Sequence, residues 1–545
     1  MSHNITSMTL KNVSLFFKGE LTPRGPSSLC YYRPSYLVRK LKNRGALLTL
    51  LWSFLVTGVF NFYVKQNHGV VLNIQLVAGG LTLPIAGWLA DVYFGRYKVI
   101  HMSMWIMWIA ITLASASSVV AELVESYSSI SKYITGALII TSVIGFGGFQ
   151  ANNIQFGVDQ LCCASTTEIS AYISWYIWCS YSIHLQTHVL GNLVICVQLS
   201  AALCTVMLFN HWLVKEPITR NPFKLIYSVV RYALQHKHPR FRSAFTYCED
   251  ELPSRIDFGK SKYGGPFTTE QVEDVKTFFR MLTVGSFVCI LLGIVVSLFV
   301  LKEEISNLLI NRHSIENLAK RCYSEELTQQ FFNYSWVVII PLYEFILYPL
   351  FSRCLAEFSY RSKFTLGVVL HTVTILAFML IVIIARHNSL EHYDHTSSHK
   401  NVTLECILYE GNDALTLNLD SRWMAVPNFL YSISVAVLGI SSIEFGISQA
   451  PYSIRGLIMS TAYGMIALAA ALTVAVSVPF MKRFDSIVWG TGIISCEFWY
   501  TLMILIIETI VGVTLIAAMK WYKKRKREDV LPSEHIFAER YYAED

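Results

Sequence analysis

The sequence predicts an all-α membrane protein with twelve transmembrane helices arranged in two six-helix halves. Only 15% of its 545 residues are charged, 13% are aromatic, and the mean hydropathy is +0.44. Soluble domains carry about 25% charged residues and do not bury so large an apolar share. We therefore expect the bilayer to be the solvent for most of the chain.

A membrane-spanning helix needs about 20 apolar residues, and twelve stretches of the sequence meet that condition. The first six lie near 46–64, 70–92, 99–120, 134–156, 169–190 and 193–214. The second six lie near 281–301, 336–353, 364–385, 424–446, 456–480 and 498–519. A long polar stretch separates the two groups, which indicates an N-terminal half (45–214) and a C-terminal half (281–519) joined by a linker (215–280).

Basic residues indicate the orientation of these helices. The N-terminal segment 1–44, the linker and the tail 520–545 hold much of the Lys and Arg in a chain of net charge +7. An excess of basic residues marks cytosolic segments and favours contact with anionic lipid, so we expect all three in the cytosol and no nucleic-acid partner. Segment 1–44 lacks the apolar stretch of a signal peptide. The loop 302–335 also carries basic residues and fits this orientation least well.

The end of the linker carries a helix-start pattern. Thr268 and Gln271 have the spacing of a capping box, and Val272, Val275 and Phe279 then fall on one helical face. This pattern predicts a short amphipathic helix that lies under the membrane before the seventh span.

The loop 386–421 is expected on the opposite side of the membrane. It contains Asn401-Val-Thr403, the acceptor sequence for N-glycosylation. Cys322 and Cys406 are both expected on that side, which leaves a disulfide between them open. None of the twelve cysteines has the spacing of a zinc site or a redox pair. We expect neither a metal nor a cofactor.

Residues 87–98, Gly-Trp-Leu-Ala-Asp-Val-Tyr-Phe-Gly-Arg-Tyr-Lys, form a charged turn between two apolar stretches. Asp91 falls at a helix end, where it can hold Arg96 or the positive N-terminus of a neighbouring helix. The segment resembles the loop between helices 2 and 3 of the major facilitator superfamily, in which it gates the cytosolic side. The matching residues are Gly87, Asp91, Gly95, Arg96 and Lys98.

Further segments narrow the resemblance to the proton-dependent oligopeptide transporters, the POT or PTR family. Residues 145–160 are similar to the family signature Gly-x-Gly-Gly-Ile-Lys-Pro-Asn with Phe-Gly-x-Asp-Gln. Residues 341–349 resemble Pro-Ile-Phe-Asp/Glu followed by Tyr-Pro, and residues 443–451 resemble Leu-Glu-Phe-x-x-Ser-Gln-Ala-Pro. The linker run 262–276 is similar to animal members in particular. The resemblance implies a secondary transporter that moves small solutes by rocking its two halves.

The charges that such transporters use for peptides are missing here. Family members carry Glu-x-x-Glu-Arg in the first span, whereas Ala46–Val64 contains no charged residue. Gln150 replaces the lysine that meets the peptide carboxylate, and Val435 or Ala436 replaces the glutamate that meets the peptide amine. A glutamine can hydrogen-bond a carboxylate but cannot neutralise it. The cavity should favour neutral or weakly charged solutes, or none.

The residues that we expect to line this cavity are polar or aromatic but uncharged. The candidates are Gln150, Asn152, Tyr176, Ser180 and Tyr348. The expected partner is a small solute, either a di- or tripeptide or another nitrogenous compound, beside the lipid bilayer itself.

Ionisable residues within spans are rare and point to function. Glu344 precedes Tyr348 by one turn and could equally satisfy a local backbone group. Glu444 lies near the cytosolic end of its span, where a gating ion pair is favoured over contact with substrate. His184 and His188 share a helix face but lack a third metal ligand. The candidates for proton or gating groups are Glu344, His371, Glu444 and Glu508.

No motif of an enzyme or of a nucleotide-driven pump is present. We therefore predict a secondary transporter in the plasma membrane or an endolysosomal membrane, with proton coupling left open. The alternative is a membrane sensor or scaffold that keeps the transporter fold but does not transport.

The predicted orientation has a direct test. A glycan at Asn401 should appear in the native protein and disappear in Asn401→Gln, because the model of twelve spans places this loop outside the cytosol. The measurement is a mobility shift after enzymatic deglycosylation. Labelling of the C-terminal tail by an impermeant reagent in intact cells would contradict the orientation.

Overall fold

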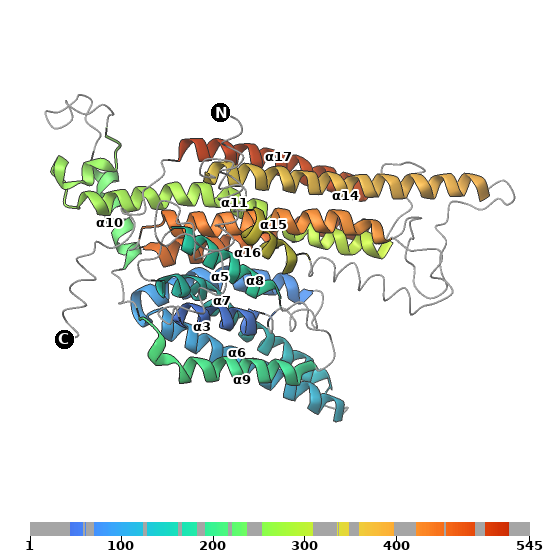
Figure 1. Ribbon diagram of the computed structural model, residues 1–545, viewed down its shortest axis with the longest axis horizontal. Helices are drawn as coiled ribbons and strands as arrows, with labels where there is room; N and C mark the ends of the chain where they lie inside the picture. Colours follow the sequence, from blue (N-terminus) through green and yellow to red (C-terminus); the bar gives the residue numbers. More distant parts are fainter. Residues whose placement is uncertain are drawn as a thin grey trace, which may run out of the picture.

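The computed structural model of the chain is helical throughout the part that it describes (Figure 1). One isolated bridge, between Lys260 and Phe267, lies outside the helices. The described residues are 44–57, 60, 70–123, 128–161, 166–182, 191–215, 221–236, 253–308, 335, 337–347, 359–396, 421–451, 454–484 and 496–522.

The N-terminal half and the linker are built from helices whose bounds follow the predicted windows. The N-terminal half contains α3 (Arg44–Trp52), η3 (Ser53–Thr57), α5 (Val70–Leu89), η4 (Ala90–Phe94), α6 (Arg96–Leu123), α7 (Ser128–Asp159), α8 (Thr166–Ser182) and α9 (Gly191–Leu208). The linker region contains η8 (Asn210–Trp212), α10 (Pro222–Gln235), η9 (Asp257–Gly259) and η10 (Ser261–Tyr263). Of these short elements, η3 and η4 are π-helical turns.

The C-terminal half contains the remaining helices. They are α11 (Thr269–Leu308), the apolar helix Val337–Ile346 with the π-helical turn η12 (Tyr343–Leu347), α14 (Tyr360–Thr396), η14 (Ser421–Met424), α15 (Ala425–Gln449), α16 (Arg455–Phe484) and α17 (Cys496–Trp521). Each of the twelve predicted windows holds a described helix. Seven described helices are long and apolar enough to cross a membrane, and three shorter ones are also apolar.

The helices of each half run side by side along the long axis of the molecule (Figure 1). Each half has its own apolar core. In the N-terminal half, Trp52, Met104, Phe149 and other side chains from α3, α6, α7 and α9 pack together. In the C-terminal half, α11, α14, α15 and α17 pack around Leu291 and neighbouring residues. The outer helices carry many exposed apolar side chains, as expected for helices that are surrounded by lipid.

The two halves meet along α5 and α16. A Cβ atom at Gly464 of α16 would lie 2.8 Å from the carbonyl oxygen of Gly80 on α5, so only glycine permits this approach of the two backbones. A second apolar cluster crosses between the halves and includes Ile154 and Ile177 on one side and Ile440 on the other. The halves are therefore closed against each other along these helices.

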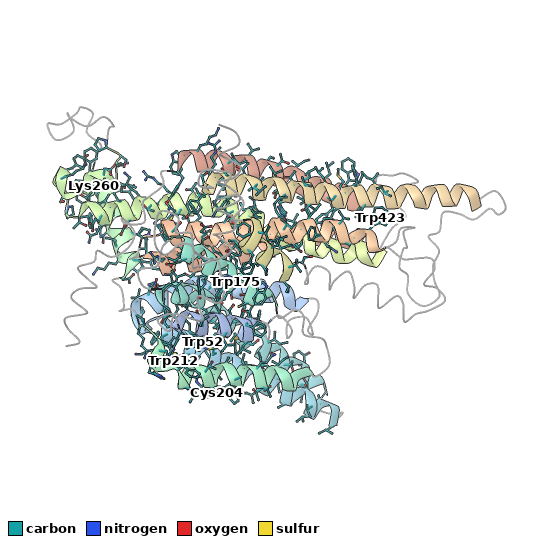
Figure 2. All side chains as sticks on the ribbon, in the orientation of Figure 1. Trp52, Trp175, Cys204, Trp212, Lys260 and Trp423 are labelled. Carbon is teal, nitrogen blue, oxygen red and sulfur yellow. The ribbon has the colours of Figure 1, made fainter. Side chains whose placement is uncertain are left out.

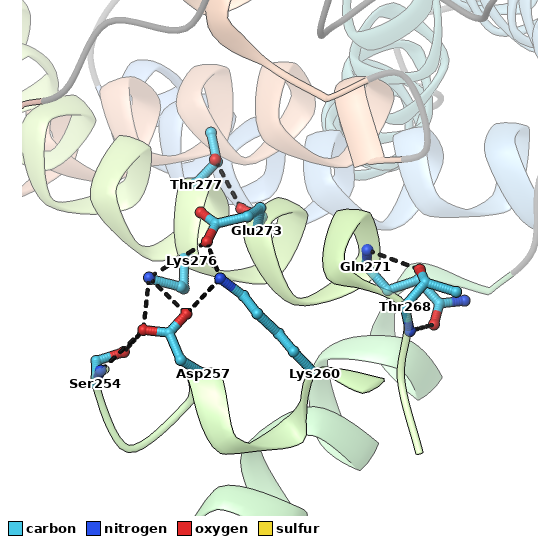
Figure 3. A network of polar contacts seen from close by, with 8 residues as sticks. All are labelled: Ser254, Asp257, Lys260, Thr268, Gln271, Glu273, Lys276 and Thr277. Carbon is cyan, nitrogen blue, oxygen red and sulfur yellow. Dashed lines mark hydrogen bonds and ion pairs between the residues drawn. The ribbon is translucent and has the colours of Figure 1, made fainter. Parts of the chain in front are cut away.

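The linker is fixed to the start of α11 by a network of ion pairs (Figure 3). Lys260 Nζ lies 2.6 Å and Lys276 Nζ lies 2.9 Å from Asp257 Oδ1, and both lysines also contact Glu273. Burial raises the pKa of the Asp257 carboxyl, but hydrogen bonds from Lys260, Ser254 and Lys276 outweigh burial and hold this pKa well below its usual range. The linker therefore docks through charges that are partly shielded from water.

The helix that begins after Thr268 starts as predicted but is much longer than predicted. The capping box is present, because Gln271 N donates to Thr268 Oγ1 at 3.2 Å and Thr268 N donates to Gln271 Oε1 at 3.1 Å. No separate short helix follows among the described residues, since α11 continues without a break to Leu308. The amphipathic helix of the linker is α10 instead. Val272 and Val275 share a buried face as predicted, but they belong to the start of the long helix α11 and pack against α10.

The network predicts how the linker responds to substitution and to pH. Asp257→Asn should weaken docking of residues 256–267 by about 1–3 kcal/mol, because the buried Lys260 and the half-buried Lys276 lose their shared carboxylate. In the native protein the contribution is complete above the usual aspartate pKa of about 4 and is lost as the pH falls through the lowered pKa.

Hydrogen exchange of residues 256–267 in the full-length protein measures this docking. The variant should exchange about tenfold faster or more at neutral pH. Glu270→Gln, a change at an exposed residue of the same region, serves as the control and should leave the exchange rate unchanged. Equal exchange in both variants and the native protein would contradict the assignment.

Candidate functional site

The turn between α5 and α6 has the backbone that its glycine spacing predicts. The π-helical turn η4 (Ala90–Phe94) ends at Gly95, whose φ of 80° lies in the left-handed region that favours glycine. Gly95 N donates to Ala90 O at 2.9 Å. This tight reversal brings Asp91 and Arg96 to the same end of the N-terminal half.

Asp91 and Arg96 form the expected ion pair. Arg96 Nε and Nη2 donate to Asp91 Oδ1 at 3.1 Å and 3.0 Å, and Arg96 Nη1 also contacts Asp159 at the end of α7. Asp91 is buried, with 5% of its surface exposed. Arg96 thus ties the α5–α6 turn to α7. Lys98 is exposed and lies outside this network.

Asp91 also reaches across to the other half. Its carboxylate accepts a hydrogen bond from the backbone nitrogen of Leu457, in the first turn of α16. A helix N-terminus carries partial positive charge and unpaired N–H groups, so a carboxylate stabilises it. A Cβ atom at Gly456 would overlap the Asp91 carboxylate, and one at Gly87 would overlap Ser460. Glycine at both positions permits the contact.

A network of uncharged polar groups occupies the region in which the resemblance would place charges. Thr49 Oγ1 and Tyr172 Oη lie 2.7 Å apart. Asn153 Nδ2 donates to Thr49 O at 3.2 Å and to Tyr176 Oη at 3.4 Å. These residues come from α3, α7 and α8 and are all buried. Hydroxyl and amide groups therefore hold these three helices together without a charge.

Ser53 and Ser180 extend this network to the π-helical turn η3, with their hydroxyl oxygens 2.6 Å apart. Tyr176 and Ser180, predicted for the cavity, thus belong to the network. The sequence reading missed Thr49, Ser53, Asn153 and Tyr172. Their signal was the i, i+4 spacing of two hydroxyl residues in an otherwise apolar first span. We use the term neutral network for Thr49, Ser53, Asn153, Tyr172, Tyr176 and Ser180.

The other predicted cavity residues take different positions. Asn152 is buried and donates to Gly148 O of its own helix at 2.9 Å. Gln150 is half-buried, and its Oε1 has no hydrogen-bond partner among the described residues. Tyr348 lies outside the described residues, as does the glycosylation candidate Asn401.

Glu344 lies between the two halves. It sits in the π-helical turn η12 with 3% of its surface exposed, and it forms a hydrogen bond with Ser174 of α8. Beside this contact, the rings of Trp175 and Phe345 have centroids 5.8 Å apart. Figure 2 shows Trp175 in the middle of the molecule, between the two groups of helices. Among the described residues, no basic side chain forms an ion pair with Glu344.

The remaining ionisable candidates form pairs within the C-terminal half. Lys363 Nζ donates to Glu444 Oε2 at 2.6 Å, which joins α14 to α15. His371 Nδ1 lies 2.9 Å from Glu508 Oε1, which joins α14 to α17, and both residues are fully buried. His371 Nε2 and Glu508 Oε2 have no hydrogen-bond partner among the described residues. Neither pair touches the neutral network.

The described residues contain no group of three side chains able to hold a metal ion, and His184 and His188 lie outside them. A cavity of about 60 Å³ lies between α11, α15 and α16. Its lining, which includes Phe278, Met281 and Tyr463, is mostly apolar. An apolar space of this size does not suit a peptide backbone, whose polar groups would lose their partners in water.

This arrangement of two helical halves, with the Asp91 and Arg96 turn between α5 and α6, is that of a membrane transporter of the major facilitator type. Residues 188–492, more than half of the chain, match the family profile described as PTR2, POT family. The chain belongs to the POT family, as its sequence segments predict.

Two curated relatives are similar to this chain. Solute carrier family 15 member 5 of Homo sapiens is 22% identical over 239 residues, which cover 39% of this chain and 40% of that protein. Protein NRT1/PTR FAMILY 2.9 of Arabidopsis thaliana is 21% identical over 476 residues, which cover 77% of this chain and 78% of that protein. The match thus spans less than half the length of the human relative.

Solved structures show the same fold. An auto-inhibited POT family peptide transporter aligns with a TM-score of 0.57 at 16% identity, covering 88% of this chain and 98% of that one. The POT family transporter PepTSo aligns with a TM-score of 0.56 at 14% identity, covering 87% and 98%. The predicted fold class is confirmed.

The contacts of Asp91 predict a role in closing one side of the transporter. Asp91→Asn should keep folding and expression but shift the population toward states open on the predicted cytosolic side. The bond to the Leu457 backbone crosses between the halves and is worth about 1–3 kcal/mol when it is charge-assisted, so weakening it with an amide should shift the population by about tenfold.

Cysteine probes placed on cavity-facing residues report this shift through their labelling rate from the cytosolic side. Lys98→Gln provides a matched control, because Lys98 belongs to the same motif but is exposed and outside the ion-pair network. If labelling rates in Asp91→Asn equalled those of the control, Asp91 would have no gating role.

Proposed function

We propose that this chain is a secondary transporter of small solutes that recognises them without charges at both ends of the site. Membership of the POT family supports transport and argues against an enzyme. The neutral network supports the finer statement, because it joins the first, fourth and fifth spans, and the resemblance would place coupling and peptide-clamping charges in the first and fourth of these. This network is the observation on which the proposal depends.

Paired charges in a low-dielectric cavity recognise both ends of a zwitterion strongly and in one orientation. The neutral network offers hydroxyl and amide groups, which hydrogen-bond a solute but do not offset its charge. Gln150 has an unpartnered Oε1 among the described residues, so it can accept a hydrogen bond from an amide or amine. Neutral or weakly charged nitrogenous solutes fit these groups better than dipeptides.

Transport would require the two halves to separate on the side where Asp91 caps α16. The described contacts, from Gly80 and Gly464 to the apolar cluster around Ile440, correspond to a state closed along α5 and α16. Rocking of the halves about a central site would exchange these contacts for equivalent ones on the other side. These closing contacts can form and break reversibly, which a cycle between inward-open and outward-open states requires.

Glu344 is the best candidate for any residual proton coupling. It lies between the halves, bonds to Ser174 of the opposite half and has no ion-pair partner among the described residues. His371, Glu444 and Glu508 are each engaged in pairs inside the C-terminal half. When the halves rock, the surroundings of a group that contacts both halves change. The motion can therefore change the protonation of such a group.

The same proposal places the chain as a multi-pass glycoprotein of the plasma membrane or an endolysosomal membrane. A sensor or scaffold without transport is the second candidate. The missing charges favour it, because a binding surface can survive the loss of coupling groups while the gate and the packing between halves persist.

Proton-driven dipeptide uptake is the measurement that tests this function. In proteoliposomes, uptake of a labelled zwitterionic dipeptide at external pH about 5.5 and 7.5 should be weak or absent, because the end charges of the dipeptide find no partners. A blocked, uncharged dipeptide should be taken up better. Any pH dependence should disappear in Glu344→Gln and persist in the exposed control Glu270→Gln.

Strong pH-driven dipeptide accumulation that neither Glu344→Gln nor His371→Gln reduces would overturn the proposal. Absence of uptake for every small nitrogenous solute, with normal expression and folding, would instead favour the sensor or scaffold.

A further inference from the structure

The linker helix α10 (Pro222–Gln235) presents one face of unusual composition. Phe223, Tyr227 and Leu234 are exposed by 48%, 64% and 66%. At 100° per residue these three positions lie within about 40° of one another, and Lys224 and Arg231 lie directly beside them. The exposed face of α10 therefore has an apolar edge and a basic edge.

The opposite face of α10 is fixed to the C-terminal half. Val229 is fully buried and Ala233 nearly so, and α10 packs with Val272 and Val275 of α11. The ion-pair network of the linker holds the segment after α10 to the same part of α11 (Figure 3). The exposed face of α10 thus points away from a rigid support.

This support lies where α11 enters the membrane. The apolar window of α11 begins near residue 281. Val272 and Val275 lie nine and six residues before it, which is about 9–14 Å along the helix on the approach to the membrane surface. A helix packed against these residues is held at the level of the lipid headgroups. Its exposed aromatic and aliphatic side chains then lie at the boundary between lipid headgroups and acyl chains, where apolar side chains are favoured.

No acidic side chain of the described residues is paired with the basic edge of α10. Lys224 and Arg231 form no ion pair among the described residues, and the sequence of α10 contains no acidic residue. The nearby acids Asp257 and Glu273 are already paired with lysines.

We propose that the exposed face of α10 binds the anionic lipid headgroups of the membrane surface beside it. The apolar edge enters the boundary between headgroups and acyl chains, and Lys224 and Arg231 contact the negative headgroups. Each basic side chain near an anionic surface favours binding about fivefold. The bilayer thereby supplies the negative partner that the described residues do not give to Lys224 and Arg231.

This contact would also reach the gate. The rings of Phe223 and Trp88 have centroids 6.1 Å apart, and Trp88 precedes Asp91 by one helical turn on α5. The helix α10 therefore touches the N-terminal half through Phe223 while it is packed on the C-terminal half. Anionic lipid that holds α10 in place should stabilise the state in which the two halves are closed on this side.

Photo-crosslinking from the exposed face tests the proposal. The full chain with Tyr227→p-benzoylphenylalanine is reconstituted in nanodiscs of phosphatidylcholine, either pure or in a three-to-one mixture with phosphatidylserine. Mass spectrometry then identifies the crosslinked molecules. We expect phosphatidylserine adducts to exceed their share of the bilayer by about fivefold or more. The added substitutions Lys224→Glu and Arg231→Glu should abolish this enrichment.

The matched control reverses two exposed basic residues on other helices, Arg361→Glu and Lys520→Glu, and should preserve the enrichment at position 227. Adducts that follow the bulk lipid ratio in every variant would overturn the proposal. Crosslinks to another segment of this chain would also overturn it, because they would show that the protein itself covers the face. Size-exclusion profiles of all variants establish that each one is folded.

Discussion

The closed arrangement of this protein depends on a carboxylate that belongs to one half and satisfies the backbone of the other. Asp91 lies at the end of α5, is held by Arg96 and accepts from the first turn of α16. This contact is geometrically available only because Gly456 and Gly87 have no side chains. The backbones can then pack at Gly80 and Gly464 further along the same helices. One charged group and a row of glycines thus determine how closely the halves approach.

The neutral network changes the energetics at the centre of the molecule. Burying a charge without a partner costs several kcal/mol, whereas a hydroxyl or amide with a hydrogen bond costs little. Thr49 bonds Tyr172, Asn153 bonds Thr49 and Tyr176, and Ser53 bonds Ser180, so these uncharged groups link three helices. The N-terminal half therefore holds its shape with no need for a substrate or a proton to balance charge. Asp91 and Glu344 are then ionisable groups that lie at the contact between the halves, and Glu344 is the one of these two without an ion pair among the described residues.

The sequence predicted the features that depend on local spacing. The Asp91 and Arg96 pair spans five residues, and the capping box at Thr268 spans three, so both follow from the turn or helix on which they lie. Asp159, Ser174 and Leu457 come from distant parts of the chain, and no spacing rule brings them to Arg96, Glu344 or Asp91. The amphipathic pattern after Thr268 was real, but its apolar face is covered by α10, a contact that only the fold determines.

The three π-helical turns η3, η4 and η12 have a mechanical consequence. Each contains an extra residue in its turn, which interrupts the regular hydrogen-bond ladder of the helix at that point. A π turn that reverts to an α turn advances the register by one residue and rotates the side chains beyond it by about 100°. These turns carry Ser53, Asp91 and Glu344, which contact other helices in the closed arrangement. The molecule thus contains joints at which a polar side chain can exchange one neighbouring helix for another while the helices on either side stay intact.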